Sequence, residues 1–109
     1  MKSHSKLDEE KILLLRAGQK DDQDAFAHLY QKYSPILLDY LIRYDGNITT
    51  REELVQECFL RAWQNRRSFR AASSVKTYLI GIAKNVANEQ IKKKQSENRL
   101  YKFMEIPIR

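Results

Sequence analysis

The chain has 109 residues and a net charge of +6, with 20 Lys and Arg residues against 14 Asp and Glu residues. This length fits one domain with a modest core, and the scarcity of chain breakers (three Gly, two Pro) favours a mostly helical protein. The sequence has no run of about 18 apolar residues that could span a membrane, and its start, MKSHSKLDEEK, lacks the apolar segment of a signal peptide. We therefore expect a cytoplasmic protein.

The charge is distributed unevenly along the chain. Residues 1–60 carry 8 basic and 11 acidic side chains, a net of −3, whereas residues 61–109 carry 12 basic and 3 acidic side chains, a net of +9. A basic half suggests a polyanionic partner that binds at one end of the chain. A solvated basic surface without a partner is the alternative explanation of the same numbers.

The first half of the chain predicts two helices. We expect a flexible start at residues 1–6, then a first helix that stops at Gly18, a residue type common just after helix ends. Asp21 or Asp22 is the expected N-cap of the second helix, in which aromatic and aliphatic residues recur at helical spacing. Pro35 lies inside this pattern, and we expect a kink there.

A third helix is predicted to begin at the capping box Thr50-x-x-Glu53. Its buried stripe has the spacing i, i+3, i+4, i+7 and comprises Val55, Cys58, Phe59 and Ala62. The other faces combine carboxylates, amides and leucines, a combination that suits a protein interface. The candidate interface residues are Glu53, Leu54, Gln56, Glu57, Leu60 and Arg61. A solvated helix face would show the same charges.

A polar loop and a basic fourth helix follow. Arg66, Arg67 and Arg70 lie within five loop positions and can grip phosphates. Ser73 or Ser74 is the expected cap of the fourth helix, whose buried residues are Val75, Leu79, Ile82, Ala83 and Val86. Its outward face combines lysines, which hold phosphates, with asparagines, which can read base edges. These residues are Lys84, Asn85, Asn88 and Lys92.

Catalytic and metal-binding patterns are missing from the sequence. The three glycines are scattered and form no phosphate-binding loop, and Cys58 is the single cysteine. His4 and His28 share no metal-ligand spacing with each other or with this cysteine. We therefore expect no cofactor, no metal and no enzymatic activity.

Three segments of the chain carry a specific pattern, namely DAFAHLYQKYSPILLDYL, EELVQECFLRAW and TYLIGIAKNVANEQIKKK. They resemble region 2 of bacterial RNA polymerase sigma factors of the extracytoplasmic-function (ECF) group, in the sigma-70 family, and the resemblance covers roughly residues 8–94. It implies an all-α, compact bundle of about four helices. Residues 95–109 would then be the start of a linker or a C-terminal tail. The family's second domain (region 4), a helix-turn-helix, is missing, which suggests a cut in the linker or a naturally short protein.

The resemblance also implies partners for the two surfaces. The third-helix interface residues would dock on the β′ clamp helices of RNA polymerase. The arginine loop, with Lys76 and Tyr78, would engage the displaced non-template promoter strand, and the outward face of the fourth helix would recognise the minus-ten element and help to melt it. Asn85 falls at the position of a pocket for a flipped base. The family usually has Trp where this chain has Tyr78, so the stacking role of this residue is open. Capture by an anti-sigma factor and generic binding of duplex nucleic acid are the alternative functions.

Overall fold

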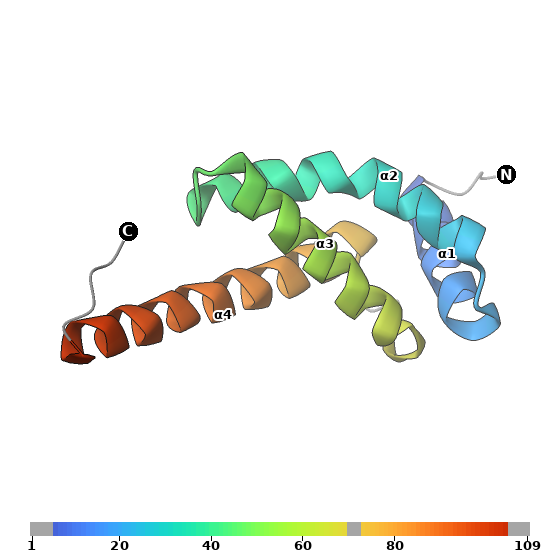
Figure 1. The fold of residues 1–109 in the computed structure, drawn as a ribbon. Helices are drawn as coiled ribbons and strands as arrows, with labels where there is room; N and C mark the ends of the chain where they lie inside the picture. Colours follow the sequence, from blue (N-terminus) through green and yellow to red (C-terminus); the bar gives the residue numbers. More distant parts are fainter. Residues whose placement is uncertain (1–5, 70–72, 105–109) are drawn as a thin grey trace, which may run out of the picture.

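In the computed structural model, residues 6–69 and 73–104 are described. They form four α-helices and two 3₁₀ turns, and no strand occurs among them: α1 (Lys6–Lys20), α2 (Gln23–Tyr40), η1 (Leu41–Arg43), α3 (Ile48–Gln64), η2 (Arg66–Ser68) and α4 (Val75–Met104). The predicted all-α fold with four helices is therefore confirmed. Figure 1 shows α1, α2 and α3 gathered around the first half of α4, with α3 crossing it, while the second half of α4 continues alone.

Two of the predicted caps are confirmed. The Asp22 carboxylate accepts a hydrogen bond from the Ala25 amide at 3.0 Å and caps α2, and the Ser74 hydroxyl accepts one from the Thr77 amide at 3.0 Å at the start of α4. The predicted capping box at Thr50 is wrong, because α3 begins earlier. Asn47 is its N-cap, and the side-chain oxygen of Asn47 accepts from the Thr50 amide.

Gly18 does not end the first helix, contrary to the prediction. It lies inside α1, buried, where a Cβ atom would come within 2.2 Å of the Arg66 carbonyl oxygen. The glycine therefore allows α1 to pack directly on the backbone of η2. The chain reverses instead at Asp21, which adopts a left-handed φ of 52°. The first helix also includes Lys6, which we had placed in the flexible start; residues 1–5 lie outside the described residues.

The core is one cluster to which all four helices contribute. Its buried residues include Leu14 of α1, Leu29, Tyr33 and Leu37 of α2, the predicted stripe of α3, and Val75, Leu79, Ala83, Val86 and Ala87 of α4. The predicted Ile82 is only partly buried. One buried acid joins α1 to α2, because Glu10 accepts hydrogen bonds from the Tyr33 hydroxyl and the Lys32 ammonium group.

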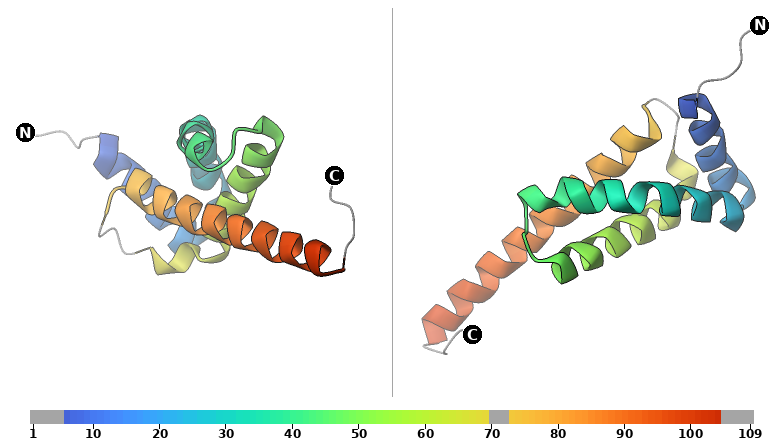
Figure 2. Two further views of the ribbon diagram at one scale, coloured as in Figure 1. Left: turned by 90° about the vertical axis from the view of Figure 1, so that its left-hand side faces the viewer. Right: turned by 90° about the horizontal axis from the view of Figure 1, so that it is seen from above.

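The last helix is longer than predicted. It runs for 30 residues, so the domain boundary that we placed at residue 94 falls inside a helix. Side chains of α4 alternate between buried and exposed up to Gln90, but every residue from Ile91 to Met104 is exposed. Both views in Figure 2 show this second half projecting away from the other helices. The helix that carries the predicted reading face therefore extends well past the bundle.

Candidate protein and nucleic-acid interfaces

The acidic face of α3 is partly exposed and partly occupied by internal contacts. Glu53, Gln56 and Leu60 are exposed, and 49% of Leu60 remains accessible. Leu54, which we predicted to lie on the surface, is only 6% exposed and belongs to the core. Leu54 lies on the side of α3 that packs against α4, two turns before Arg61. The prediction that Leu54 is exposed was therefore wrong. Leu60 is the accessible apolar side chain on this face.

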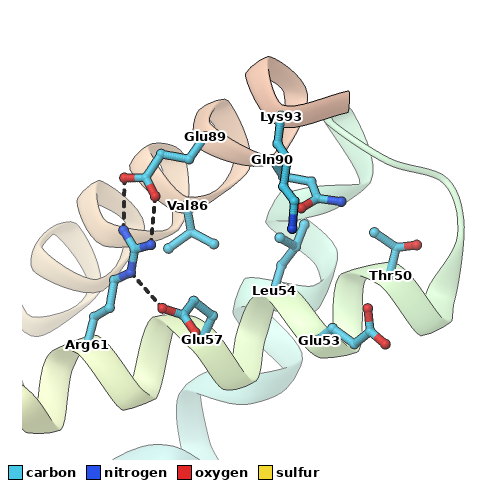
Figure 3. Close-up of a pocket in the computed structure, with 9 residues that line it drawn as sticks. All are labelled: Thr50, Glu53, Leu54, Glu57, Arg61, Val86, Glu89, Gln90 and Lys93. Atoms are coloured by element: carbon cyan, nitrogen blue, oxygen red, sulfur yellow. Dashed lines mark hydrogen bonds and ion pairs between the residues drawn. The ribbon is translucent and has the colours of Figure 1, made fainter. Parts of the chain in front are cut away.

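Arg61 connects α3 to α4. Its guanidinium group donates two hydrogen bonds to the carboxylate of Glu89 and one, from Nε at 2.9 Å, to Glu57 (Figure 3). The hydrogen bond from Arg61 holds the pKa of Glu89 below its ordinary value, and the hydrogen bonds to Glu89 and Glu57 raise the pKa of Arg61. Two of the predicted interface side chains, Glu57 and Arg61, are therefore committed to an ion-pair network within the domain.

A polar groove of about 330 Å³ lies between α3 and α4 beside this network. It is lined by Thr50, Glu53, Leu54, Glu57, Arg61, Val86, Glu89, Gln90 and Lys93 (Figure 3). Five lining residues, Thr50 and the four from α4, were not among the predicted interface residues. Arg61 and Glu89 are 28 positions apart in the chain, and no local pattern indicates that they meet.

The arginines of the loop differ in accessibility. The Arg66 side chain is 18% exposed, pairs with Asp21 at 2.8 Å and lies over the Trp63 ring at 4.1 Å. The Arg67 side chain is 69% exposed and approaches the same carboxylate at 3.3 Å. The hydrogen bond from Arg66 is the main cause of the lowered pKa of Asp21. Arg70, the third predicted phosphate ligand, lies outside the described residues.

Two aromatic rings meet at the start of α4. Tyr78 packs edge to face on Phe69 with ring centroids 5.0 Å apart, and burial raises the pKa of the Tyr78 hydroxyl. Phe69 is buried and Tyr78 is partly accessible, while the nearby Lys76 is exposed. The Tyr78 side chain is thus packed on Phe69 and still partly accessible to solvent. Phe69 was not predicted as a site residue, although it packs on Tyr78, which was.

The outward face of α4 is assembled as the sequence predicts. Lys84, Asn85, Asn88 and Lys92 are all exposed. At about 100° of rotation per residue they occupy one side of the helix. Their side chains face away from the buried stripe of the same helix, which fixes its rotation against the core. The result is a basic and amide-rich surface on a rigid element.

Among the described residues, no group of three or more His, Cys, Asp or Glu side chains could hold a metal ion. Cys58 is buried, and desolvation raises the pKa of its thiol to about 12, so it is a packing residue and a poor nucleophile. None of the described helices combines the length and the apolar character needed to cross a membrane.

This geometry matches a known domain fold. The NMR structure of an engineered region 2 of sigmaE in complex with GTAAAA superimposes with a TM-score of 0.70 at 29% identity, over 81% of this chain and 90% of that one. Residues 29–97 match the Sigma-70 region 2 family. The chain therefore belongs to that family, as a region 2 domain of the ECF type, and the resemblance seen in the sequence is confirmed.

Proteins with similar sequences are also named as ECF sigma factors. The ECF RNA polymerase sigma factor SigW of Bacillus subtilis is 35% identical over 83 residues, which are 76% of this chain and 44% of the relative. SigX of the same organism is 31% identical over 68% of this chain and 38% of its own length. SigG of Mycobacterium tuberculosis is 40% identical over 57% of this chain and 16% of its own length. The chain thus spans less than half the length of these relatives.

Proposed function

We propose that this domain recognises the promoter minus-ten element as part of transcription initiation and docks on RNA polymerase through α3. The observation that carries the proposal is the chemical contrast between two faces of one bundle. The outward face of α4 defined by Lys84, Asn85, Asn88 and Lys92 combines lysines and asparagines, whereas the exposed face of α3 has carboxylates around Leu60. The family membership and the fold shared with a DNA-bound region 2 support it.

The α4 face is suited to single-stranded DNA. The exposed Lys84 and Lys92 supply a sequence-independent grip on phosphates. Asn85 and Asn88 offer paired donors and acceptors to the edges of unpaired bases. Unstacking a base costs a few kcal/mol, and stacking on an aromatic side chain returns about 1–3 kcal/mol per base. In this proposal Tyr78, which packs on Phe69, contributes this contact.

The α3 face is suited to a protein partner. Leu60 supplies an apolar anchor, and Glu53 and Gln56 around it supply charge and hydrogen bonds that fix the register. We assign the β′ clamp helices as that partner. Since Arg61 is bound to both Glu57 and Glu89, the part of Arg61 and Glu57 in docking is to keep α3 in place. Glu53 and Leu60 are therefore the contacts that direct binding.

The polymerase contact is tested with an isolated β′ clamp-helix fragment of a bacterial RNA polymerase. We expect the chain to bind it, and Glu53→Lys with Leu60→Ala to weaken binding about tenfold or more. Asp39→Lys, the same charge reversal at an exposed position of α2, is the matched control and should bind normally. No binding by the wild-type chain would rule out this docking surface. The alternative function, capture by an inhibitor protein, would then be favoured.

The DNA contact is tested with equal-length oligonucleotides. We expect the chain to prefer a single-stranded non-template minus-ten sequence over both its duplex and a scrambled strand. Binding that is equal for duplex and single strand, and insensitive to scrambling, would contradict promoter recognition and leave a generic basic nucleic-acid binder.

A further inference from the structure

The two described arginines of the loop are held very differently. Arg66 donates from Nε to the Asp21 carboxylate and from Nη1 to the Trp63 carbonyl oxygen, both at 2.8 Å. Its guanidinium carbon also lies 4.1 Å from the centre of the Trp63 ring, and its side chain is only 18% exposed. Arg66 is therefore engaged inside the domain. Arg67 is the described loop arginine that a phosphate can reach.

The backbone that carries these two arginines is fixed against α1. A Cβ atom at Gly18 would come within 2.2 Å of the Arg66 carbonyl oxygen and 3.5 Å of the Cα atom of Arg67. The absence of that atom lets the helix pack directly on η2. Because this contact leaves the backbone little room, we expect only the side chain of Arg67 to move when a ligand binds.

The Arg67 side chain is bound weakly. Among the described residues, Asp21 is the one residue to which it donates, from Nη2 at 3.3 Å to each carboxylate oxygen. The Arg67 side chain is 69% exposed and that of Asp21 is 50% exposed. Ion pairs this exposed are screened by water and exchange readily. A phosphate can accept two parallel hydrogen bonds from an arginine, so it can take the place of Asp21 at Arg67.

The Asp21 carboxylate lies at the edge of the candidate DNA surface. Arg67 is two positions before Phe69, whose ring centroid is 5.0 Å from that of Tyr78, the proposed stacking residue. The left-handed backbone of Asp21 turns the chain between α1 and α2 and brings the carboxylate to η2. The hydrogen bond from Arg66 lowers the pKa of Asp21, so the carboxylate is charged at neutral pH. A fixed negative charge therefore lies beside the cation that would hold the strand.

We propose that Asp21 is an internal competitor of DNA: its carboxylate occupies Arg67 in the free domain and is replaced there by a phosphate of the opened strand. This inference rests on the proposed function, because it assigns Arg67 to the strand that Tyr78 contacts. Arg66 keeps Asp21 in place after the exchange, so the carboxylate still repels the incoming phosphate. Asp21 therefore lowers the sequence-independent part of the affinity and leaves discrimination between bases to α4.

The test measures binding to the minus-ten single strand and to a scrambled strand of equal length by fluorescence anisotropy. Asp21→Asn should tighten binding to both strands about threefold to fivefold and leave the ratio of the two affinities unchanged. Arg67→Gln should weaken binding to both strands and reduce the salt slope by about 0.7. Asparagine tolerates the left-handed conformation of position 21, and circular dichroism checks that both variants are folded.

A double variant and a matched control separate the contact from a general charge effect. In the Arg67→Gln background, Asp21→Asn should change binding less than about 1.5-fold, because the cation for which Asp21 competes is gone. Asp24 is exposed and forms no ion pair with the described residues, and Asp24→Asn removes the same charge three positions later. It should also change binding less than about 1.5-fold. A gain from Asp24→Asn as large as that from Asp21→Asn would overturn the proposal.

Failure of this inference is separable from failure of the proposed function. If the wild-type chain selects the minus-ten single strand but Asp21→Asn does not tighten binding, the competitor role is overturned while promoter recognition stands. Weaker binding by Asp21→Asn would instead show that Asp21 positions the loop for DNA. If the wild-type chain shows no strand or sequence preference at all, the proposed function fails, and the assignment of Arg67 to the opened strand fails with it.

Discussion

The guanidinium group of Arg61 and the carboxylate of Glu89 form a two-point ion pair, with N–O distances of 2.6 and 3.0 Å. The pair joins the helix that carries the candidate polymerase surface to the helix that carries the candidate DNA surface. Because Arg61 also binds Glu57 on its own helix, the network fixes the position of both helices at one point. Arg61, which we expected to contact a partner protein, therefore holds two helices of the domain together.

Loss of this pair should weaken the domain modestly. Arg61→Ala and Glu89→Ala are each expected to lower the melting temperature by about 2–5 °C, because the groups are partly exposed and solvent screens the pair. The double variant should cost less than the sum of the two, as expected for residues that interact directly. Thermal unfolding followed by circular dichroism measures all three, and strictly additive effects would show that the pair contributes nothing.

Stability should fall in acid. Among the described residues, the pKa values of four carboxyl groups are lowered, chiefly by hydrogen bonds: from Arg66 to Asp21, from the Ala25 amide to Asp22, from the Asn47 amide to Asp45 and from Arg61 to Glu89. A folded-state pKa below the unfolded one stabilises the protein above the unfolded pKa, and this stabilisation is lost as the pH falls through the folded pKa.

We therefore expect a constant melting temperature from about pH 8 to pH 6 and a decline below about pH 5. Asp21→Asn should make the decline shallower, because it removes one of the four carboxyl groups. Asparagine tolerates the left-handed conformation of this position, so the backbone is preserved. A variant whose stability declines as steeply as that of the wild type would show that the contacts of Asp21 with Arg66 and Arg67 carry no stability.

Two glycines should respond oppositely to the same substitution. Gly18→Ala places a methyl group 2.2 Å from the Arg66 carbonyl oxygen. We expect a loss of about 1–3 kcal/mol from overpacking, in spite of alanine's better helix propensity. Gly81 has no atom within 4 Å of the added carbon, and Gly81→Ala should gain about 0.5–1 kcal/mol. Urea unfolding measures both, and a stabilising Gly18→Ala would contradict the close contact with η2.

Two leucines of α3 should separate folding from binding. Leu54→Ala opens the core and should cost about 2–5 kcal/mol of stability. Leu60→Ala, at a half-exposed position, should cost less than about 0.5 kcal/mol while weakening binding to the clamp-helix fragment. Urea unfolding and fragment binding are measured on both variants. A large loss of stability from Leu60→Ala would mean that this side chain packs within the domain.

Two residues of the outward face of α4 should affect DNA binding in different ways. Asn85→Ala is expected to reduce discrimination between the minus-ten strand and a scrambled strand by about 1–3 kcal/mol, because it removes base-edge hydrogen bonds. Lys92→Ala should weaken both strands alike and reduce the salt slope by about 1. Fluorescence anisotropy at several salt concentrations measures both quantities. Equal losses on the two strands from both variants would show that Asn85 reads no base.

Local sequence patterns predicted the four helices. The features that these patterns missed depend on contacts between helices. The stripe of α3 from Val55 to Ala62 is buried as its helical spacing indicates. Gly18 has the composition of a helix stop, but its role is set by a carbonyl group 48 positions later in the chain. Leu54 lies beside surface residues in sequence, yet α4 covers it. The partnership of Arg61 with Glu89 likewise depends on how two helices cross.

The long α4 also affects how the size of the protein is measured. A compact chain of this length has a radius of gyration of about 13 Å, but the Cα radius here is 17.1 Å and the extents are 67 × 23 × 22 Å. A rod of this shape diffuses more slowly than a sphere of its mass. On a gel-filtration column calibrated with spherical standards, a monomer of 12.9 kDa would therefore elute at the volume of a heavier species. Sedimentation equilibrium, which depends on mass and not on shape, is the suitable measurement of its association state.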